Sequence, residues 1–262
     1  MSFYQKRFYR IYIPYLVIYL PYCLIFILLG KYTFGDSLLC LCTLEYWLFH
    51  KGAWFVSMIL VLYLVAPFLF RLLSGTYKWF IAIGIIIALM ILCNIPVSDH
   101  SSTSILHNTQ WAFGRVPSLI LGMAIGSSCK ANKQLPLPQV LLFCFVSFVM
   151  SVFIGAWKCQ WLIVPIIAYI FIFLLKLTKD SWIDKSLKLL GAISLESYLT
   201  NITLNSLLRA LAPAYFTSPV FYGHYLEYTV VIVAGLLLAY YVHNVAQVTI
   251  SKLTKWHKYL VV

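Results

Sequence analysis

Charged residues are scarce in this sequence, and acidic ones are the scarcest. Only 10% of the 262 residues are charged, and only 7 residues are Asp or Glu. A soluble globular domain has about 25% charged and about 45–50% apolar residues. Here 63% are hydrophobic and the mean hydropathy is +0.91. This excludes a soluble fold, which would leave too much apolar surface in water, and predicts an all-α, polytopic transmembrane helix bundle.

Other signals are missing as well. The seven cysteines show no zinc-ligand spacing, so we expect no metal site and interpret them as small apolar filler. The basic N-terminal segment leads into a long apolar run without a small-residue cleavage site, so we expect the first helix to stay in the mature protein. No long polar region or internal repeat divides the chain, which predicts a single membrane domain over residues 1–262.

Long apolar runs predict about eight transmembrane helices. Roughly 20 residues at about 1.5 Å each cross a hydrocarbon core of about 30 Å. A shorter apolar piece, residues 37–50, includes Glu45 and His50 and predicts a re-entrant or interfacial segment. The predicted spans are residues 11–30, 53–74, 78–97, 111–128, 137–157, 161–177, 189–211 and 226–249.

The basic residues indicate an orientation. The net charge of +12 would suggest a nucleic acid partner in a soluble protein. In a membrane protein the excess Lys and Arg belongs to cytoplasmic loops, so we expect no nucleic acid partner. With a cytoplasmic N-terminus, the predicted spans put most basic residues inside and only Lys31, Lys51 and Lys158 clearly outside. Both termini are therefore expected in the cytoplasm. Residues 98–110 form a polar outside loop and residues 178–188 a cytoplasmic loop.

Arg7 and Arg10 are the first candidate binding residues. A spacing of three residues puts both guanidinium groups on one helix face. Two such groups at the cytoplasmic end can bind phosphates bidentately. They can equally act as a topology anchor, and spacing alone leaves both interpretations open.

Three further clusters place polar groups at membrane depth, where charge is costly and often functional. Glu45, His50 and Lys51 precede Trp54, and a His beside a carboxylate can act as a general base or simply face water. Arg115, near the outer end of the fourth predicted span, can clamp an anionic or sugar substrate or can snorkel to the interface.

The fourth cluster lies in the seventh predicted span. Ser197, Asn201 and Asn205 recur every four residues and form a polar stripe, with Glu196 one turn in from the cytoplasmic end. Such a stripe either lines a wet cavity or makes hydrogen bonds between helices. Composition and spacing thus fit either an enzyme or a transporter.

Four segments in order resemble the acyltransferase-3 family of integral membrane O-acyltransferases. The residues that carry the resemblance are Arg7-Phe8-Tyr9-Arg10 with Pro14, Trp54-Phe55 with Tyr63-Leu64 and Pro67, Arg115 with Gly122-Met123, and Leu190-Gly191-Ala192-Ile193-Ser194 with Tyr198-Leu199 and Asn201. Each segment alone is a weak signal, but four in order with fitting spacing are fairly specific.

The resemblance implies a function. Such enzymes move an acyl group, often acetyl, from cytoplasmic acyl-CoA to a cell-surface glycan or lipid-linked sugar. It assigns Arg7 and Arg10 to the acyl donor, which is a co-substrate and not a bound cofactor. We expect Trp54, Arg115 and Glu196, with Asn201, to line the cavity. The expected location is the bacterial inner membrane, as a multi-pass protein in contact with lipid.

The chain departs from the family pattern at two points. Asn201 stands where the family usually has His, and an amide cannot do acid/base work. The family also has a basic residue eleven positions before a catalytic His, in a helix that precedes the Arg7 segment. Members have about ten spans, so the family's first two helices are expected to be missing here. The spacing is absent at His50, His100, His107, His224, His243 and His257.

Two hypotheses follow. The chain is an acyltransferase if another helix supplies the base, and an inactive relative if none does. The alternative is a non-catalytic glycan or lipid transporter, or a partner subunit. Neither hypothesis requires a metal.

Overall fold

The computed structural model describes residues 3–95, 104–132, 178–212 and 221–260, together with residues 138, 141, 142, 145 and 167. All regular secondary structure in these residues is helical, as the composition predicts. The helices are α1 (Phe3–Leu28), α2 (Phe34–Leu41), α3 (Glu45–Phe49), α4 (Trp54–Leu72), α5 (Lys78–Asn94), α6 (Ile105–Phe113), α7 (Val116–Asn132), α10 (Trp182–Ala192), α11 (Ser194–Leu211) and α13 (Phe221–Leu260).

The chain divides into two compact units. The first contains Met1–Tyr46, Lys51–Ser57 and Lys185–Val262, and the second contains Trp47–His50 and Met58–Asp184. The division falls within α4, between Ser57 and Met58.

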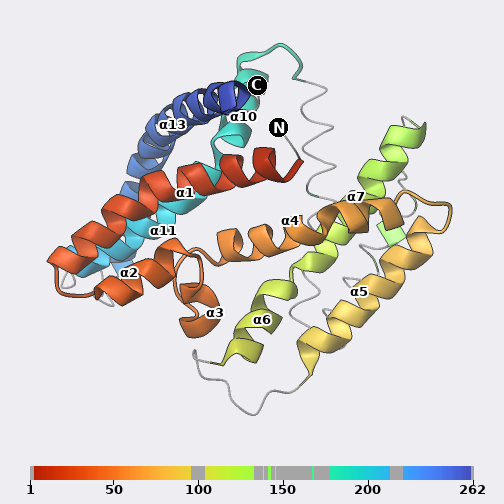
Figure 1. The fold of residues 1–262 in the computed structure, drawn as a ribbon, viewed down its shortest axis with the longest axis horizontal. Coiled ribbons are helices and arrows are strands. Elements are labelled where there is room, and N and C mark those ends of the chain that lie inside the picture. The colour runs from red at the N-terminus through yellow and green to blue at the C-terminus, as the bar shows by residue number, and fades with distance from the viewer. Residues whose placement is uncertain are drawn as a thin grey trace. The chain divides into compact units, whose positions relative to one another are not determined.

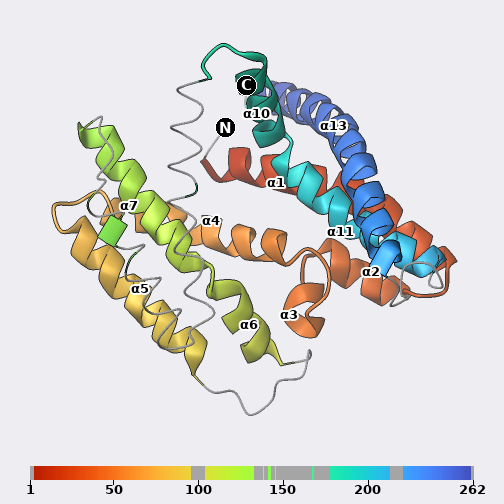
Figure 2. The same cartoon turned by 180° about the vertical axis from the view of Figure 1, so that it is seen from behind.

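In the first unit, α1, α11 and α13 pack against one another, and α2 packs on α1 (Figure 1 and Figure 2). Aromatic residues at four-residue spacing in α1 stack along one face, with ring centroids 4.3 Å apart for Tyr15 and Tyr19. Both rings are almost fully buried. Leu199 of α11 and Ala239 of α13 are fully buried too, so this core lies between the three helices.

In the second unit, α5, α6 and α7 pack together (Figure 1). Ala82, Ile120 and Leu121 are fully buried in its core. The Gln110 amide of α6 donates to the backbone oxygens of Leu92 and Ile95, at 3.1 and 2.9 Å. These bonds satisfy carbonyls at the C-terminal end of α5 that have no partner within the helix.

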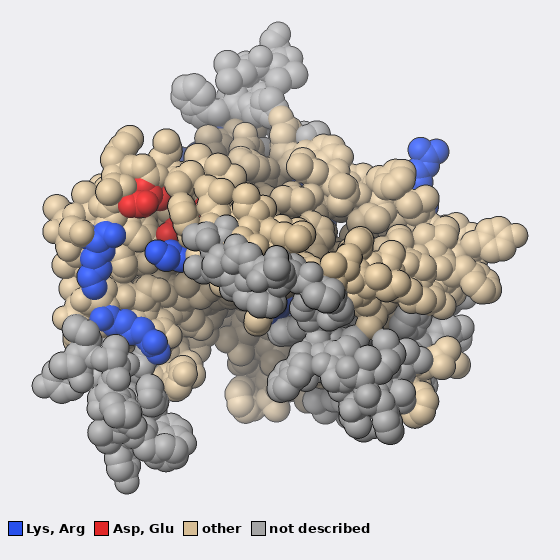
Figure 3. Space-filling model, turned by 90° about the horizontal axis from the view of Figure 1, so that it is seen from below, with Lys and Arg blue, Asp and Glu red and all other residues tan. Residues whose placement is uncertain are grey.

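Three of the described helices are long and apolar enough to cross a membrane: Phe3–Leu28, Trp54–Leu72 and Tyr228–Thr254. They correspond to the first, second and eighth predicted spans. The third predicted span corresponds to α5, a shorter apolar helix. Figure 3 shows one face of the molecule on which charged side chains are few. The chain is therefore a membrane protein, and its described part is helical.

The fourth predicted span, residues 111–128, is not one continuous helix. Helix α6 ends at Phe113, and α7 begins at Val116. The reason is Pro117, which has no backbone N–H and cannot continue a helix from residue 113, but which fits the first turn of a new helix. The outside loop predicted over residues 98–110 is helical from Ile105 onward.

The seventh predicted span, residues 189–211, is divided at Ile193 between α10 and α11. Residues 182–188, predicted as loop, form the start of α10. The Ser181 hydroxyl accepts from the Asp184 backbone N–H at 3.3 Å, and the Asp184 carboxylate accepts from the Asp180 N–H at 3.3 Å. These contacts cap the start of the helix, a pattern that Ser181 and Asp184 could have indicated from sequence.

The short apolar piece, residues 37–50, contains most of α2 and all of α3, which have 8 and 5 residues. Neither helix is long enough to cross a bilayer. The predicted spans 137–157 and 161–177 lie almost wholly outside the described residues, as do residues 98–103 of the predicted loop.

Candidate functional site

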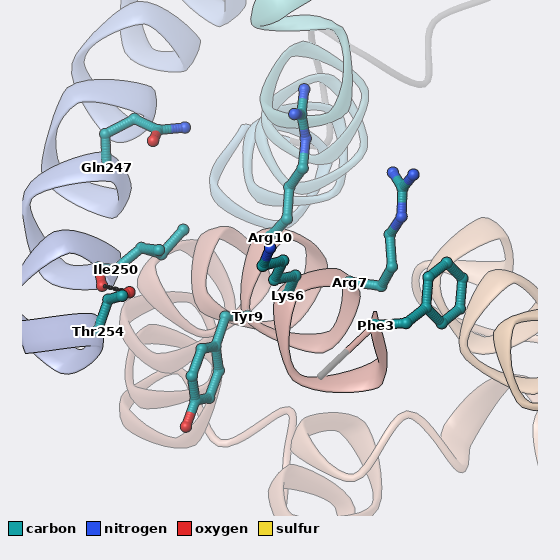
Figure 4. A pocket seen from close by; sticks show the side chains of 8 residues that line it. All are labelled: Phe3, Lys6, Arg7, Tyr9, Arg10, Gln247, Ile250 and Thr254. Atoms are coloured by element: carbon teal, nitrogen blue, oxygen red, sulfur yellow. Dashed lines mark hydrogen bonds between the residues drawn. The ribbon is translucent and has the colours of Figure 1, made fainter. Parts of the chain in front are cut away.

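A pocket of about 470 Å³ lies between the N-terminal turns of α1 and the C-terminal part of α13 (Figure 4). It is built entirely within the first unit. The residues that line it are Phe3, Lys6, Arg7, Tyr9, Arg10, Gln247, Ile250 and Thr254.

Helical spacing explains which residues reach this pocket. Lys6 and Arg10 are four residues apart, and Arg7 lies between them, so the three side chains share one face of α1. Gln247 and Thr254, two turns apart, face the pocket from α13. None of the eight lining residues is acidic. The pocket is therefore suited to an anion.

The polar side chains of the pocket differ in how they are held. The Arg7 guanidinium carbon lies 5.7 Å from the centre of the Phe3 ring, within cation–π distance. The Thr254 hydroxyl donates to the backbone oxygen of Ile250 at 2.7 Å. Figure 4 shows Gln247 extending from α13 toward the side of α1 that carries Arg10. Donors from two helices thus surround one space.

Glu196 and His243 are in hydrogen-bond contact one helical turn from this pocket. Glu196 Oε1 lies 2.9 Å from His243 Nδ1, and the side chains are 5% and 19% exposed. Glu196 lies in the first turn of α11, and His243 is four residues before Gln247 on α13. Glu196 is among the site residues predicted from the sequence, whereas no role was predicted for His243.

A close approach between α11 and α13 holds this region together. The Thr200 hydroxyl, fully buried, donates to the backbone oxygen of Gly235 at 2.9 Å. A Cβ at Gly235 would overlap Asn201 Oδ1. Asn201, predicted to line the cavity, therefore packs against the glycine, and its Oδ1 is buried without a hydrogen-bond partner among the described residues.

Trp54 belongs to the same unit as Glu196 and Asn201. Its ring lies edge-on to the Tyr198 ring of α11, with centroids 6.3 Å apart. The Tyr198 hydroxyl accepts from the backbone N–H of Phe55 at 3.3 Å. Two of the segments that resemble the acyltransferase-3 family, more than a hundred residues apart in sequence, are thus in contact.

Glu45 is buried beneath these helices and accepts a hydrogen bond from the Tyr32 hydroxyl at 2.7 Å. Its other oxygen, Oε2, has no partner among the described residues, and neither does the buried Tyr19 hydroxyl. Burial, then the bond to the Glu45 carboxylate, raises the pKa of the Tyr32 phenol.

His50 and Arg115 belong to the second unit. His50 Nδ1 lies 2.8 Å from Asn108 Oδ1, and the Asn108 amide donates to the Trp47 carbonyl at 3.0 Å. The Arg115 guanidinium lies 5.4 Å from the centre of the Trp111 ring and donates to the Trp111 carbonyl at 2.9 Å. Arg115 thus packs on an aromatic residue of the same unit.

The predicted residues are brought together in part. Arg7 and Arg10 line one pocket, and Trp54, Glu196 and Asn201 meet around α11 in the same unit, whereas Arg115 belongs to the other unit. His243 and Gln247 were missed. They are four residues apart near the end of an apolar span, so they form a polar stripe like the one predicted in the seventh span. This pattern could have identified them from the sequence.

The chain matches a known protein family. The model of the acyltransferase-3 family, described as an acyltransferase domain, matches residues 1–244. Both the pocket residues of α1 and the Glu196–His243 pair lie within this range. No curated protein and no solved structure matches the chain.

Proposed function

Because the chain belongs to the acyltransferase-3 family, we propose that it moves an acyl group from cytoplasmic acyl-CoA to a hydroxyl of a cell-surface glycan or lipid-linked sugar. That it is a membrane acyltransferase follows from the family and from its apolar helices. We further propose that the acyl group is acetyl, that the donor is acyl-CoA, that the acceptor is a sugar, and that the protein lies in the bacterial inner membrane.

The cationic pocket on α1 is the observation that carries the proposal. Lys6, Arg7 and Arg10 face one space of about 470 Å³ without an acidic neighbour in its lining. Acyl-CoA carries several phosphate oxygens at one end and its thioester at the other. Arg binds phosphate oxygens bidentately and Lys binds them as a point charge. The three cations suit the phosphate end of the donor.

The acceptor belongs deeper in the same unit. Trp54 offers an aromatic face beside Tyr198, and Glu196 and Asn201 put polar oxygens into the helix packing. Sugars bind through hydrogen bonds and through contacts with aromatic rings, which these residues can supply.

Acyl-CoA binding tests the donor site. Purified wild-type protein should bind acetyl-CoA, and Arg10→Ala should bind about tenfold to a hundredfold more weakly. A hydrogen bond to a charged group contributes about 1.5–3 kcal/mol. Arg10→Lys should fall between the two, because it keeps the charge and loses the bidentate geometry. Isothermal titration in detergent measures all three affinities.

Arg71→Ala is the matched control. Arg71 is an exposed arginine in the last turn of α4 and does not line the pocket. Its replacement should leave acetyl-CoA affinity unchanged. Equal affinity of Arg10→Ala and wild type would rule out the donor site on α1.

A further inference from the structure

The Glu196–His243 pair joins two helices in the interior of the first unit. The acid lies in the first turn of α11, and the imidazole lies in α13, 47 residues later in the chain. Glu196 is buried, whereas the side chain of His243 is 19% exposed. The carboxylate is thus shielded while the ring remains partly accessible.

The hydrogen bond determines which ring nitrogen carries the proton. With Glu196 ionised, its carboxylate can only accept, which puts the proton of the 2.9 Å bond on Nδ1 of His243. In the neutral ring this leaves the lone pair on Nε2. A carboxylate behind Nδ1 also stabilises the imidazolium that forms when Nε2 takes up a proton. The pair has the arrangement of a general base.

The position of His243 relates it to the pocket. His243, Gln247, Ile250 and Thr254 follow one another at spacings of four, three and four, so they share one face of α13. The last three line the cationic pocket, and His243 lies about 6 Å further along the helix axis. A donor with its phosphates on Arg10 would extend its pantetheine arm and thioester along this face.

We propose that His243 is the general base of acyl transfer and that Glu196 positions it. This rests on the proposed function. Nε2 of His243 takes the proton of the acceptor hydroxyl while the acceptor oxygen forms a bond to the thioester carbonyl carbon. The C–S bond then breaks, and the imidazolium returns the proton to the sulfur. The products are the acyl ester and free CoA thiol.

None of the six histidines has a basic residue eleven positions before it. His243 is instead placed by packing, because Thr200 and Gly235 hold α11 against α13. A purely structural role is the competing explanation, in which the pair only ties the two helices together.

His243→Asn separates the two explanations. The amide nitrogen of Asn can replace Nδ1 as donor to Glu196, but Asn has no counterpart of Nε2. We expect it to keep thermal stability and acetyl-CoA affinity. Transfer of radiolabelled acetyl from acetyl-CoA to envelope glycan in membrane vesicles should fall about a hundredfold to ten-thousandfold, the usual contribution of a general base.

Two more variants complete the test. Glu196→Gln keeps the shape and a hydrogen-bond acceptor for Nδ1 but removes the charge, so transfer should drop with acetyl-CoA affinity unchanged. Glu196→Gln also tests the proposal if the His243→Asn variant does not fold. Asn244→Ala changes the exposed neighbour on α13 and should behave as wild type.

The outcomes are distinct. Wild-type transfer rates in His243→Asn, or tight acetyl-CoA binding by a wild-type protein that transfers no acetyl, would overturn the assignment of His243. Failure of the wild type to bind acetyl-CoA at all would overturn the proposed function, and the base with it. Loss of transfer with retained binding supports both.

Discussion

Gly235 lies at a close approach of α11 and α13. It is buried, its carbonyl accepts from Thr200, and a Cβ there would overlap Asn201 Oδ1. A larger residue there requires the Asn201 side chain to move. Since Glu196 and His243 lie on these two helices, their 2.9 Å contact depends on the same packing.

Gly235→Ala should therefore destabilise the protein by about 1–3 kcal/mol, the usual cost of overpacking a core. Thermal unfolding in detergent, followed by size-exclusion chromatography, measures the change. Gly84→Ala in α5 is the control, because nothing lies within 4 Å of a Cβ there. It should be neutral or slightly stabilising, since Ala favours helix more than Gly.

Asn201→Ala provides a second check on the same contact. Asn201 Oδ1 has no hydrogen-bond partner among the described residues, so its removal relieves the overlap without breaking such a bond. The cost of Gly235→Ala should shrink in that background. An undiminished cost would place the strain elsewhere.

Among the elements, α2 begins with a complete capping box. Thr33 Oγ1 accepts from the Asp36 N–H at 3.1 Å, and Asp36 Oδ2 accepts from the Thr33 N–H at 2.9 Å. The Thr33 hydroxyl also donates to Asp36 Oδ2 at 2.7 Å. These bonds favour the ionised carboxylate, and they hold the pKa of Asp36 below its usual value.

A pH dependence of α2 follows from this lowered pKa. The capping contribution is present above the unfolded pKa of Asp, about 3.9, and is lost as pH falls through the lower folded pKa. We expect hydrogen exchange of the α2 amides, corrected for intrinsic rates, to become several-fold faster in that acid range. Asp36→Ala should exchange at the faster rate at neutral pH.

Asp180→Asn is the control for α2, because Asp180 lies in the turn before α10. It should leave α2 exchange unchanged. If exchange in α2 does not respond to Asp36→Ala, the box does not limit the opening of the helix.

At the scale of the whole molecule, the basic residues predict the orientation of the chain in the membrane. The predicted spans leave Lys252, Lys255 and Lys258 on the same side as Lys6, Arg7 and Arg10. Basic residues beside spans stay in the cytoplasm. Both ends of the chain are therefore expected inside, with the pocket opening there.

Reporter fusions test this orientation. A fluorescent protein joined after Val262 should fluoresce, and alkaline phosphatase at the same point should be inactive, since each works on only one side of the membrane. Alkaline phosphatase joined after Lys51 should be active, because this loop is expected outside. The opposite pattern would put the cationic pocket away from cytoplasmic acyl-CoA and contradict the donor proposal.

Much of the helix content could be read from the sequence. The predicted spans 53–74 and 78–97 agree closely with α4 and α5, because a long apolar run has to form a helix in lipid. The divisions at Gly114–Arg115 and at Ile193 were missed. Hydropathy averaged over a long stretch of sequence does not detect a single proline or a capped amphipathic turn, and these features end the helices here.

The site was predictable only in part. Arg7 and Arg10 share a helix face, so their spacing alone predicts that they act together. Gln247, Thr254 and His243 join the site from α13, more than two hundred residues later, and no local pattern links them to α1.

The sequence by itself determined the membrane class, the helical content and the family, because apolar length and motif order are properties of the chain alone. Only the tertiary structure decided which polar groups meet. Glu196 faces His243, and Glu45 faces Tyr32. A partner across helices depends on how closely the helices approach, and here the Thr200 hydroxyl of α11 reaches the Gly235 carbonyl of α13, where Asn201 packs against the glycine.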